Sequence, residues 1–306
     1  MAGWSRSSAR PWPATAAPDS DRSGGKEALM TRICALTTVR NDRLFLPKWI
    51  THYGAAFGAE NLFVLLDGHD QEPPANANHV NIIRLPHIPL ERVAAMRRRA
   101  RVMSRFAAGL FHYFDIAIAT DVDEFIVVDP ATGKGLAEYL AGLQIRGSVS
   151  ALGLDVGQHL HEEAALDPAR PFLSQRAYAH VSARYTKPAI TARPLTWGSG
   201  MHRIKGRNFH IDPNLYLFHF GMVDYRLATG KTLDADRLAT GWGAHLSRRE
   251  RLFEIIANAT PRDADAFLPI ARRRQTWRRP LYAWNKPAML PGDPVVRIPA
   301  RFSGLV

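Results

Sequence analysis

The chain is poor in cysteine, in long apolar runs and in acidic residues. The first two shortages exclude disulfides, cysteine-based zinc clusters and membrane-spanning helices, and the third makes the protein basic. Cys34 is the one cysteine among 306 residues, which excludes an intramolecular disulfide and a zinc cluster built on cysteines. No window approaches the roughly 20 apolar residues that a membrane-spanning helix needs. The N-terminus lacks the apolar core of a secretory signal peptide. We therefore expect a cytoplasmic chain without a membrane-spanning helix.

The shortage of acids leaves a strongly basic protein. The sequence has 40 Lys and Arg against 28 Asp and Glu, which gives a formal net charge of +12. Residues 226–306 hold 15 basic and 7 acidic residues, a surplus of 8, so much of the excess lies in the last quarter. Such a field favours anionic partners: sugar nucleotides, phosphorylated lipids, the inner face of the cell membrane, or nucleic acid.

Composition divides the chain into three parts. Residues 1–29 are rich in Ala, Ser, Pro, Gly and Arg and lack periodicity, which predicts a disordered N-terminal tail. Residues 30–225 alternate short apolar segments with amphipathic ones, which predicts one α/β domain. Residues 226–306 are predicted to form a basic helical C-terminal extension.

The pattern of the second part predicts a mostly parallel sheet with helices on both faces. The predicted strands are Arg32–Val39, Asn61–Leu66, Val80–Leu85, Asp115–Thr120, Ser148–Asp155, Tyr185–Ile190 and Leu215–Phe220. The predicted helices are Leu44–Phe57, Leu90–Leu110 and Gly135–Leu143. Ligands of such sheets bind beyond the carboxyl ends of the strands.

The most informative motif lies where the fourth predicted strand ends. Asp121 and Asp123 are separated by one residue, so in an extended backbone their side chains lie on the same side. Converging carboxylates repel each other unless a cation lies between them, and Mg²⁺ and Mn²⁺ take carboxylates while leaving positions for phosphate oxygens. The alternative is a surface turn that happens to hold two aspartates. The apolar segments on both sides, the second being Phe125–Val128, favour a metal–phosphate site.

Two more polar motifs follow the first two strands, Arg40-Asn41-Asp42 and Asp67-Gly68-His69-Asp70. With them, the chain resembles the GT-A glycosyltransferases, and most of all a bacterial family-2-like branch with (K/R)-N-(D/E) and D-x-D-E-F motifs, the latter here Asp121–Phe125. The resemblance covers residues 31–130. Beyond these it depends on Trp197–His202 and Tyr216–Phe220.

The resemblance implies a GT-A-like fold and a metal-dependent, inverting transfer of a sugar from a nucleoside diphosphate sugar to a glycan or lipid-linked acceptor, as in polysaccharide biosynthesis. Mn²⁺ or Mg²⁺ is the implied cofactor, and a UDP-sugar is the favoured donor. The implied nucleotide-sugar contacts are Thr37, Thr38, Asp42, Asp67 and Asp121, and the implied metal ligands are Asp121, Asp123 and His219. The usual Asp-Asp-Gly-Ser-x-Asp is here Leu66-Asp67-Gly68-His69-Asp70, which leaves the donor base open.

An inverting transfer needs a base that takes the proton of the acceptor hydroxyl. Asp155 is the preferred candidate, because it ends an apolar strand at the predicted catalytic edge. Glu162 and Glu163 are alternatives, and a plain turn residue before Gly157 is the competing interpretation of Asp155. The resemblance places Glu124 beside the metal site as a supporting catalytic residue.

Trp197 and His202 are the candidate acceptor contacts. The glycines between them would let the backbone approach a sugar, and Trp197 could stack on its apolar face. A Gly-rich hairpin with a core tryptophan is an equally weighted alternative.

Two basic clusters remain. The arginines at 97–101 are expected to form a solvated helix face. The cluster Arg272–Arg279 interleaves with Trp277, Tyr282 and Trp284, which suits peripheral contact with an anionic membrane or a phosphorylated acceptor, and also RNA, although a plain surface helix is the default expectation.

Three functions are therefore weighed. A charge-driven binder of nucleic acid or membrane surface is the alternative to the transferase. A nucleotidyltransferase or phosphatase is disfavoured, because the sequence has no Gly-rich phosphate loop and no Walker lysine. We choose the glycosyltransferase and expect no nucleic-acid partner.

Overall fold

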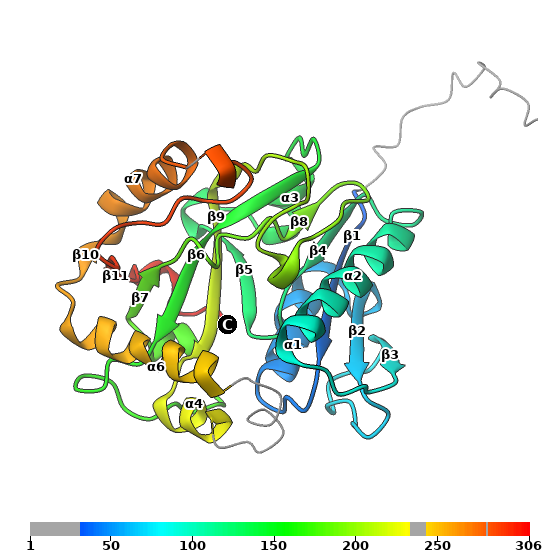
Figure 1. The fold of residues 1–306 in the computed structure, drawn as a ribbon, viewed down its shortest axis with the longest axis horizontal. Helices are drawn as coiled ribbons and strands as arrows, with labels where there is room; N and C mark the ends of the chain where they lie inside the picture. Colours follow the sequence, from blue (N-terminus) through cyan, green and yellow to red (C-terminus); the bar gives the residue numbers. More distant parts are fainter. Residues whose placement is uncertain (1–30, 233–242, 280) are drawn as a thin grey trace, which may run out of the picture. The chain divides into compact units, whose positions relative to one another are not determined.

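The first half of the chain folds into parallel strands joined by helices. The computed structural model describes residues 31–232, 243–279 and 281–306 (Figure 1). The predicted tail 1–29, and the residues around Leu233 where the helical region was expected to begin, lie outside the described residues. Strands β1 (Ile33–Val39), β2 (Leu62–Asp67), β3 (Asn81–Leu85) and β4 (Ile116–Ala119) pair in parallel in the order β3-β2-β1-β4.

Two helices cover opposite faces of this parallel part. Helices α1 (Phe45–Phe57) and α2 (Arg92–Leu110) follow β1 and β3. In β1, Ala35 packs in the cluster that contains α1, while Leu36 packs in the cluster that contains α2, as alternate strand side chains require. The α/β architecture with helices on both faces of the sheet is therefore confirmed.

The second half extends the sheet with mixed pairing. Strand β9 (Ile211–Met222) pairs antiparallel with β5 (Glu124–Val128) and parallel with β6 (Ser148–Gly157). The remaining strands are β7 (Tyr178–Val181), β8 (Ile190–Thr191), β10 (Arg262–Asp263) and β11 (Val295–Arg297). Because β8 pairs antiparallel with both β4 and β6, the two halves of the sheet are continuous.

The other helices flank the second half. They are α3 (Leu136–Ala141), α4 (Tyr225–Thr232), α6 (Gly243–Asn258) and α7 (Ala264–Trp277). Short 3₁₀ turns lie at η1 (Ala59–Asn61), η2 (Pro130–Thr132), η3 (Phe172–Ser174), η4 (Ser199–Met201), η5 (Leu281–Ala283) and η6 (Ala300–Phe302). None of the described helices combines the length and apolar character that crossing a bilayer requires.

Two segments differ from the predicted elements. Phe125–Val128 belongs to β5, which the sequence pattern did not assign as a strand. Tyr185–Ile190 was predicted as a strand, but it is a turn followed by irregular backbone, and only Ile190 enters β8. Pro188 lacks the N–H that a ladder needs, and Lys187 bonds to acids instead of lying on a pleated face.

The predicted C-terminal extension contributes to the same sheet. Besides α6 and α7, residues 226–306 supply β11, which pairs antiparallel with β7. The described residues from Thr31 to Val306 form one compact unit. The domain boundary at 225 stays a prediction.

Candidate active site

The site is built on the turn between β4 and β5, at the carboxyl end of the parallel strands. Two buried hydrogen bonds fix the start of the turn: Thr37 Oγ1 donates to the Thr120 carbonyl at 2.9 Å, and Trp49 Nε1 donates to Thr120 Oγ1 at 2.9 Å. At its other end, the Phe220 N–H donates to the Asp123 carbonyl at 2.9 Å. The two aspartates are therefore held by β1, α1 and β9 together.

Asp121 lies between two cations. Arg99 Nη2, from α2, is 2.6 Å from Asp121 Oδ1, and Lys187 Nζ is 2.9 Å from Asp121 Oδ2. Burial alone would raise the pKa of Asp121, but Arg99 and Lys187 outweigh it and lower that pKa to about 2. Asp121 is thus a carboxylate at neutral pH, and both of its oxygens already face positive charge.

Lys187 also joins Asp121 to Glu124. The lysine is 1% exposed and its Nζ is 2.5 Å from Glu124 Oε1, while Glu124 Oε2 accepts the Asp121 N–H at 3.2 Å. Burial raises the pKa of Glu124 to about 7, against the opposing effect of Lys187. Burial opposes the charge on Lys187, but the two acids outweigh it and raise the pKa of the amine. Together with Arg99, the three side chains form one charge-compensated group, in which Lys187 and Glu124 are buried and Asp121 is half-buried.

His219, on β9, contacts both Asp123 and Asp155. Glu124 and Asp155 are the cross-strand partners of His219 on β5 and β6, so the three side chains share one face. His219 Nδ1 is 2.6 Å from Asp155 Oδ1, and Nε2 is 3.4 Å from Asp123 Oδ2. The ring of Tyr185 stacks on the imidazole at 3.8 Å with an interplanar angle of 13°. The imidazole is thereby fixed in orientation.

The donor set near Asp123 suits a divalent cation with few protein ligands. Within the described ranges, no three His, Cys, Asp or Glu side chains are placed to hold a metal ion together. An Nδ1–H donated to Asp155 leaves His219 Nε2 as an acceptor facing Asp123, which is the arrangement of a metal-binding histidine with a supporting carboxylate. Asp123 and His219 therefore fit a two-ligand site that phosphate oxygens and water would complete. Asp121 is directed at Arg99 and Lys187 instead.

The other predicted nucleotide contacts surround the ends of β1 and β2. Asp67 ends β2, with His87 Nδ1 at 3.3 Å and Arg98 Nη2 at 3.9 Å. The Thr38 carbonyl accepts Arg99 Nη2 at 3.0 Å, which ties this edge to Asp121.

Two of these residues have structural bonds of their own. Asp42 Oδ1 accepts the N–H groups of Leu44 and Phe45 at the start of α1, at 3.1 and 2.6 Å. The Thr37 hydroxyl is committed to the Thr120 carbonyl. Both side chains therefore shape the edge of the site.

The predicted acceptor residues differ in exposure. Trp197 is 2% exposed, and its Nε1 donates to the Pro188 carbonyl at 2.9 Å, so it packs in the core between α2 and the sheet. His202 Nδ1 lies 2.8 Å from the Arg184 carbonyl. Burial and the nearby charge of Lys187 lower the pKa of His202 to about 3. The second residue is thus a neutral imidazole within the electrostatic reach of the acid cluster.

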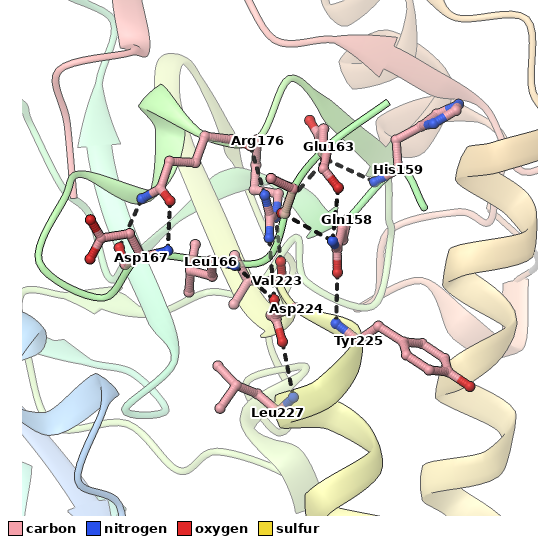
Figure 2. A network of polar contacts seen from close by, with 12 residues as sticks. Gln158, His159, Glu163, Leu166, Asp167, Arg176, Val223, Asp224, Tyr225 and Leu227 are labelled. Atoms are coloured by element: carbon pink, nitrogen blue, oxygen red, sulfur yellow. Dashed lines mark hydrogen bonds and ion pairs between the residues drawn. The ribbon is translucent and has the colours of Figure 1, made fainter. Parts of the chain in front are cut away.

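The segment between β6 and β7 is held in place by a buried arginine. Arg176 is 1% exposed, and its Nη2 lies 3.5 Å from Asp224 Oδ2 while its Nε lies 3.9 Å from Glu163 Oε2 (Figure 2). Asp224 also accepts the Leu166 N–H at 2.9 Å, and Gln158 Oε1 accepts the Tyr225 N–H at 2.9 Å. The network fastens residues 158–176 to the start of α4.

Glu162 and Glu163, the alternative candidates for the catalytic base, lie in this segment and have structural hydrogen bonds. Glu163 accepts the N–H groups of His159 and Ala177 at 2.8 and 2.6 Å, and Glu162 Oε2 accepts the Tyr178 hydroxyl at 2.5 Å. Both glutamates therefore have local structural bonds, whereas Asp155 faces the acid–imidazole cluster.

Arg99, Lys187 and Tyr185 were missed as site residues. Arg99 belongs to an arginine run whose default interpretation was a solvated face. The one available signal for Lys187 was a single charge in a segment predicted as a buried strand, since a buried charge requires an acidic partner. No pattern in the sequence indicated that Tyr185 stacks on His219.

No protein-family model matches the sequence, and no curated protein matches it. Among solved structures, the chain is similar to the mannosyltransferase PcManGT from Pyrobaculum calidifontis, which was solved in complex with GDP-Man and Mn²⁺. The two sequences are 12% identical, and the match covers 79% of this chain and 80% of that chain with a TM-score of 0.36. It is also similar to a glycosyltransferase involved in the glycosylation of the major capsid of PBCV-1, with 16% identity, coverage of 40% and 50%, and a TM-score of 0.23. Because both TM-scores are low, these likenesses carry no argument about the function of this chain.

Proposed function

We propose that this protein is a glycosyltransferase that uses a nucleoside diphosphate sugar and a divalent cation. One observation carries the proposal: His219 Nε2 lies 3.4 Å from Asp123 Oδ2 at the carboxyl edge of the parallel strands. Beside this pair, Asp121 contacts both Arg99 and Lys187. Carboxylate and imidazole ligands next to a guanidinium suit a metal-bound diphosphate, since the cation and the arginine both meet phosphate oxygens.

The residues at the ends of β1 and β2 are the proposed nucleotide side of the site. Asp67 offers a carboxylate for a ribose hydroxyl or a base N–H, and Arg98 and His87 beside it hold that carboxylate in place. Thr38 and Asp42 lie at the edge of the proposed nucleotide side. Arg99 connects this edge to the acid cluster, because it contacts both the Thr38 carbonyl and Asp121. A UDP-sugar stays the favoured donor, and the thermal-shift measurement below identifies the base.

Asp123 and His219 are the residues that would hold Mn²⁺ or Mg²⁺. Bound there, the cation would supply a Lewis acid for the departing diphosphate. Asp155 fixes the tautomer of His219 through the 2.6 Å contact to Nδ1. Lys187 lies between Asp121 and Glu124, and Lys187 and Arg99 together offset the charge of the two acids and reduce their mutual repulsion.

We assign the base function to Asp155 and propose inversion at the transferred carbon. Asp155 lies on the face of the sheet shared by Glu124 and His219, and its side chain borders the proposed metal pair. A base there would take the proton of an acceptor hydroxyl that approaches past His202. The acceptor is proposed to be a glycan or a lipid-linked sugar.

Thermal shift with nucleoside diphosphates tests the proposal directly. UDP, GDP, CDP and ADP are each added with and without Mn²⁺, because a ligand that binds the folded chain raises its melting temperature with occupancy. We expect one diphosphate to stabilise the protein in the presence of Mn²⁺ alone. Asp123→Asn and His219→Gln should each remove that metal-dependent shift.

The matched control is Asp115→Asn, which changes an exposed aspartate whose nearest cation is Arg32 at 4.0 Å. It should leave the shift unchanged. If no diphosphate stabilises the wild-type chain at millimolar concentration, with or without Mn²⁺, the proposed function is wrong.

A further inference from the structure

The end of α7 and the turn after it expose large apolar side chains that the described residues leave uncovered. Trp277 is 78% exposed, Leu281 94%, Trp284 45% and Met289 73%. Exposed apolar residues that are scattered singly need no explanation, but a cluster marks a binding surface. Here the Ala288 N–H donates to the Gln275 carbonyl at 2.9 Å, which brings the turn after α7 back against the helix end.

The same segment is uniformly basic. Residues 266–292 contain six Lys and Arg and no Asp or Glu. Arg273, Arg278 and Lys286 are exposed, and the described structure gives their side chains no ion pair. Indoles and long apolar side chains surrounded by unpaired cations are typical of segments that lie at the interface of an anionic bilayer.

A neighbouring hairpin enlarges the basic area. Arg279 donates to Asn208 Oδ1 at 2.7 Å, and Asn285 Nδ2 donates to the Ile204 carbonyl at 3.3 Å, so residues 203–208 lie against this turn. The hairpin exposes Arg203, Lys205 and Arg207 and contains no acid between residues 202 and 210.

We infer that this α7 surface (Trp277, Leu281, Trp284 and Met289 with Arg273 and Arg278) docks the protein on a bilayer that contains anionic phospholipid. Leu281 and Met289 favour a bilayer over RNA, because nucleic acid uses aromatic stacking and cations but offers no apolar phase to aliphatic side chains. The arginines meet lipid phosphates while the apolar side chains enter the boundary of the acyl chains. None of these six residues belongs to the proposed transfer site, and the inference does not depend on that site.

Vesicle co-sedimentation of the full chain at low salt tests the inference. We expect binding to vesicles of phosphatidylcholine with phosphatidylglycerol, and little binding to phosphatidylcholine alone. Trp277→Ala/Leu281→Ala and Arg273→Gln/Arg278→Gln should each weaken binding by about tenfold or more. Far-UV circular dichroism and melting curves check that the variants fold, and since these side chains are exposed, both are expected to match the wild type.

Helix α2 and the segments on either side of it supply matched controls on another part of the molecule, and are called the α2 controls (Figure 1). Arg97→Gln/Arg101→Gln makes the same change of net charge on another exposed helix face, and Ile88→Ala/Tyr113→Ala removes two exposed apolar side chains elsewhere. Both controls should keep vesicle binding within about twofold.

The inference is overturned if the α7 variants and the α2 controls lose binding equally, because net charge alone would then explain it. It is also overturned if the wild-type chain does not bind the anionic vesicles. A third contrary outcome is that a single-stranded RNA oligonucleotide binds and the α7 variants lose that binding while they keep vesicle binding. Since the assay measures sedimentation and not transfer, its failure leaves the proposed function untouched.

Discussion

At the scale of single residues, Lys187 decides how the acid cluster is arranged. Its amine lies between Asp121 and Glu124, so one buried cation contacts both a buried and a half-buried carboxylate. That Asp121 and Asp123 hold a metal ion together stays a prediction, and in the described structure Lys187 and Arg99 pair with Asp121. Asp121 is therefore a charge-paired anchor of the site, while Asp123 and His219 are the pair that fits a cation.

Lys187→Met should destabilise the protein strongly. Removing one partner from a buried ionic group leaves uncompensated charge, which costs about 3–5 kcal/mol. Without the neighbouring positive charge, Mn²⁺ should also stabilise the variant more than it stabilises the wild type. Urea unfolding with and without Mn²⁺ measures both effects.

Lys134→Met is the control, since Lys134 is exposed and has only a 4.0 Å contact with Glu138. Exposed pairs of this kind contribute about 0–1 kcal/mol. A loss of the same small size for Lys187→Met would show that the buried amine does not organise the acids.

At the scale of elements, the sequence pattern predicted what depends on local periodicity. The strand–helix alternation through β4 is correct, with element ends differing by one or two residues, because apolar spacing reports which face of a strand or helix is buried. Tyr185–Ile190 was wrong, because its conformation depends on the partners of Lys187, which lie more than 60 residues earlier at Asp121 and Glu124. Arg99 was missed for the same reason: its role comes from Thr38 and Asp121, which only the folded sheet brings near α2.

The segment between β6 and β7 depends on Arg176 in the same long-range way. Arg176→Met would leave Glu163 and Asp224 without their cation in a buried position, and we expect a loss of about 3–5 kcal/mol in unfolding free energy. Residues 158–176 should then become the first site of proteolytic cleavage, because the network in Figure 2 no longer fastens them.

Arg170→Met is the matched control in the same segment, since Arg170 is exposed and its side chain has no ion pair in the described structure. Limited proteolysis followed by mass spectrometry locates the first cut. Cleavage at the same position and rate in Arg176→Met and Arg170→Met would refute the role of the network.

At the scale of the whole molecule, neutral histidines set how stability changes with pH. Burial lowers the pKa of His52, whose Nε2 lies 2.9 Å from the Ile126 carbonyl. Burial and Lys187 lower the pKa of His202 to about 3, from an ordinary value of 6.5. At these two histidines the unfolded chain therefore binds more protons than the folded chain below about pH 6.5, so their contribution to stability falls as the pH falls from 7 to 5. Glu124, whose pKa burial raises to about 7, contributes in the opposite sense over the same range.

His52→Asn should reduce this pH dependence. Each histidine that stays neutral only in the folded state contributes a slope of up to about 1.4 kcal/mol per pH unit below its ordinary pKa. Urea unfolding at pH 7, 6 and 5 measures the slope, and His112→Asn, which removes an exposed histidine, is the control. The low pKa of Asp121 acts below this window, near pH 2 to 4, and does not contribute to the slope. An equal slope in wild type and His52→Asn would mean that the general charge repulsion of a chain with net charge +12, and not the buried imidazole, governs its sensitivity to acid.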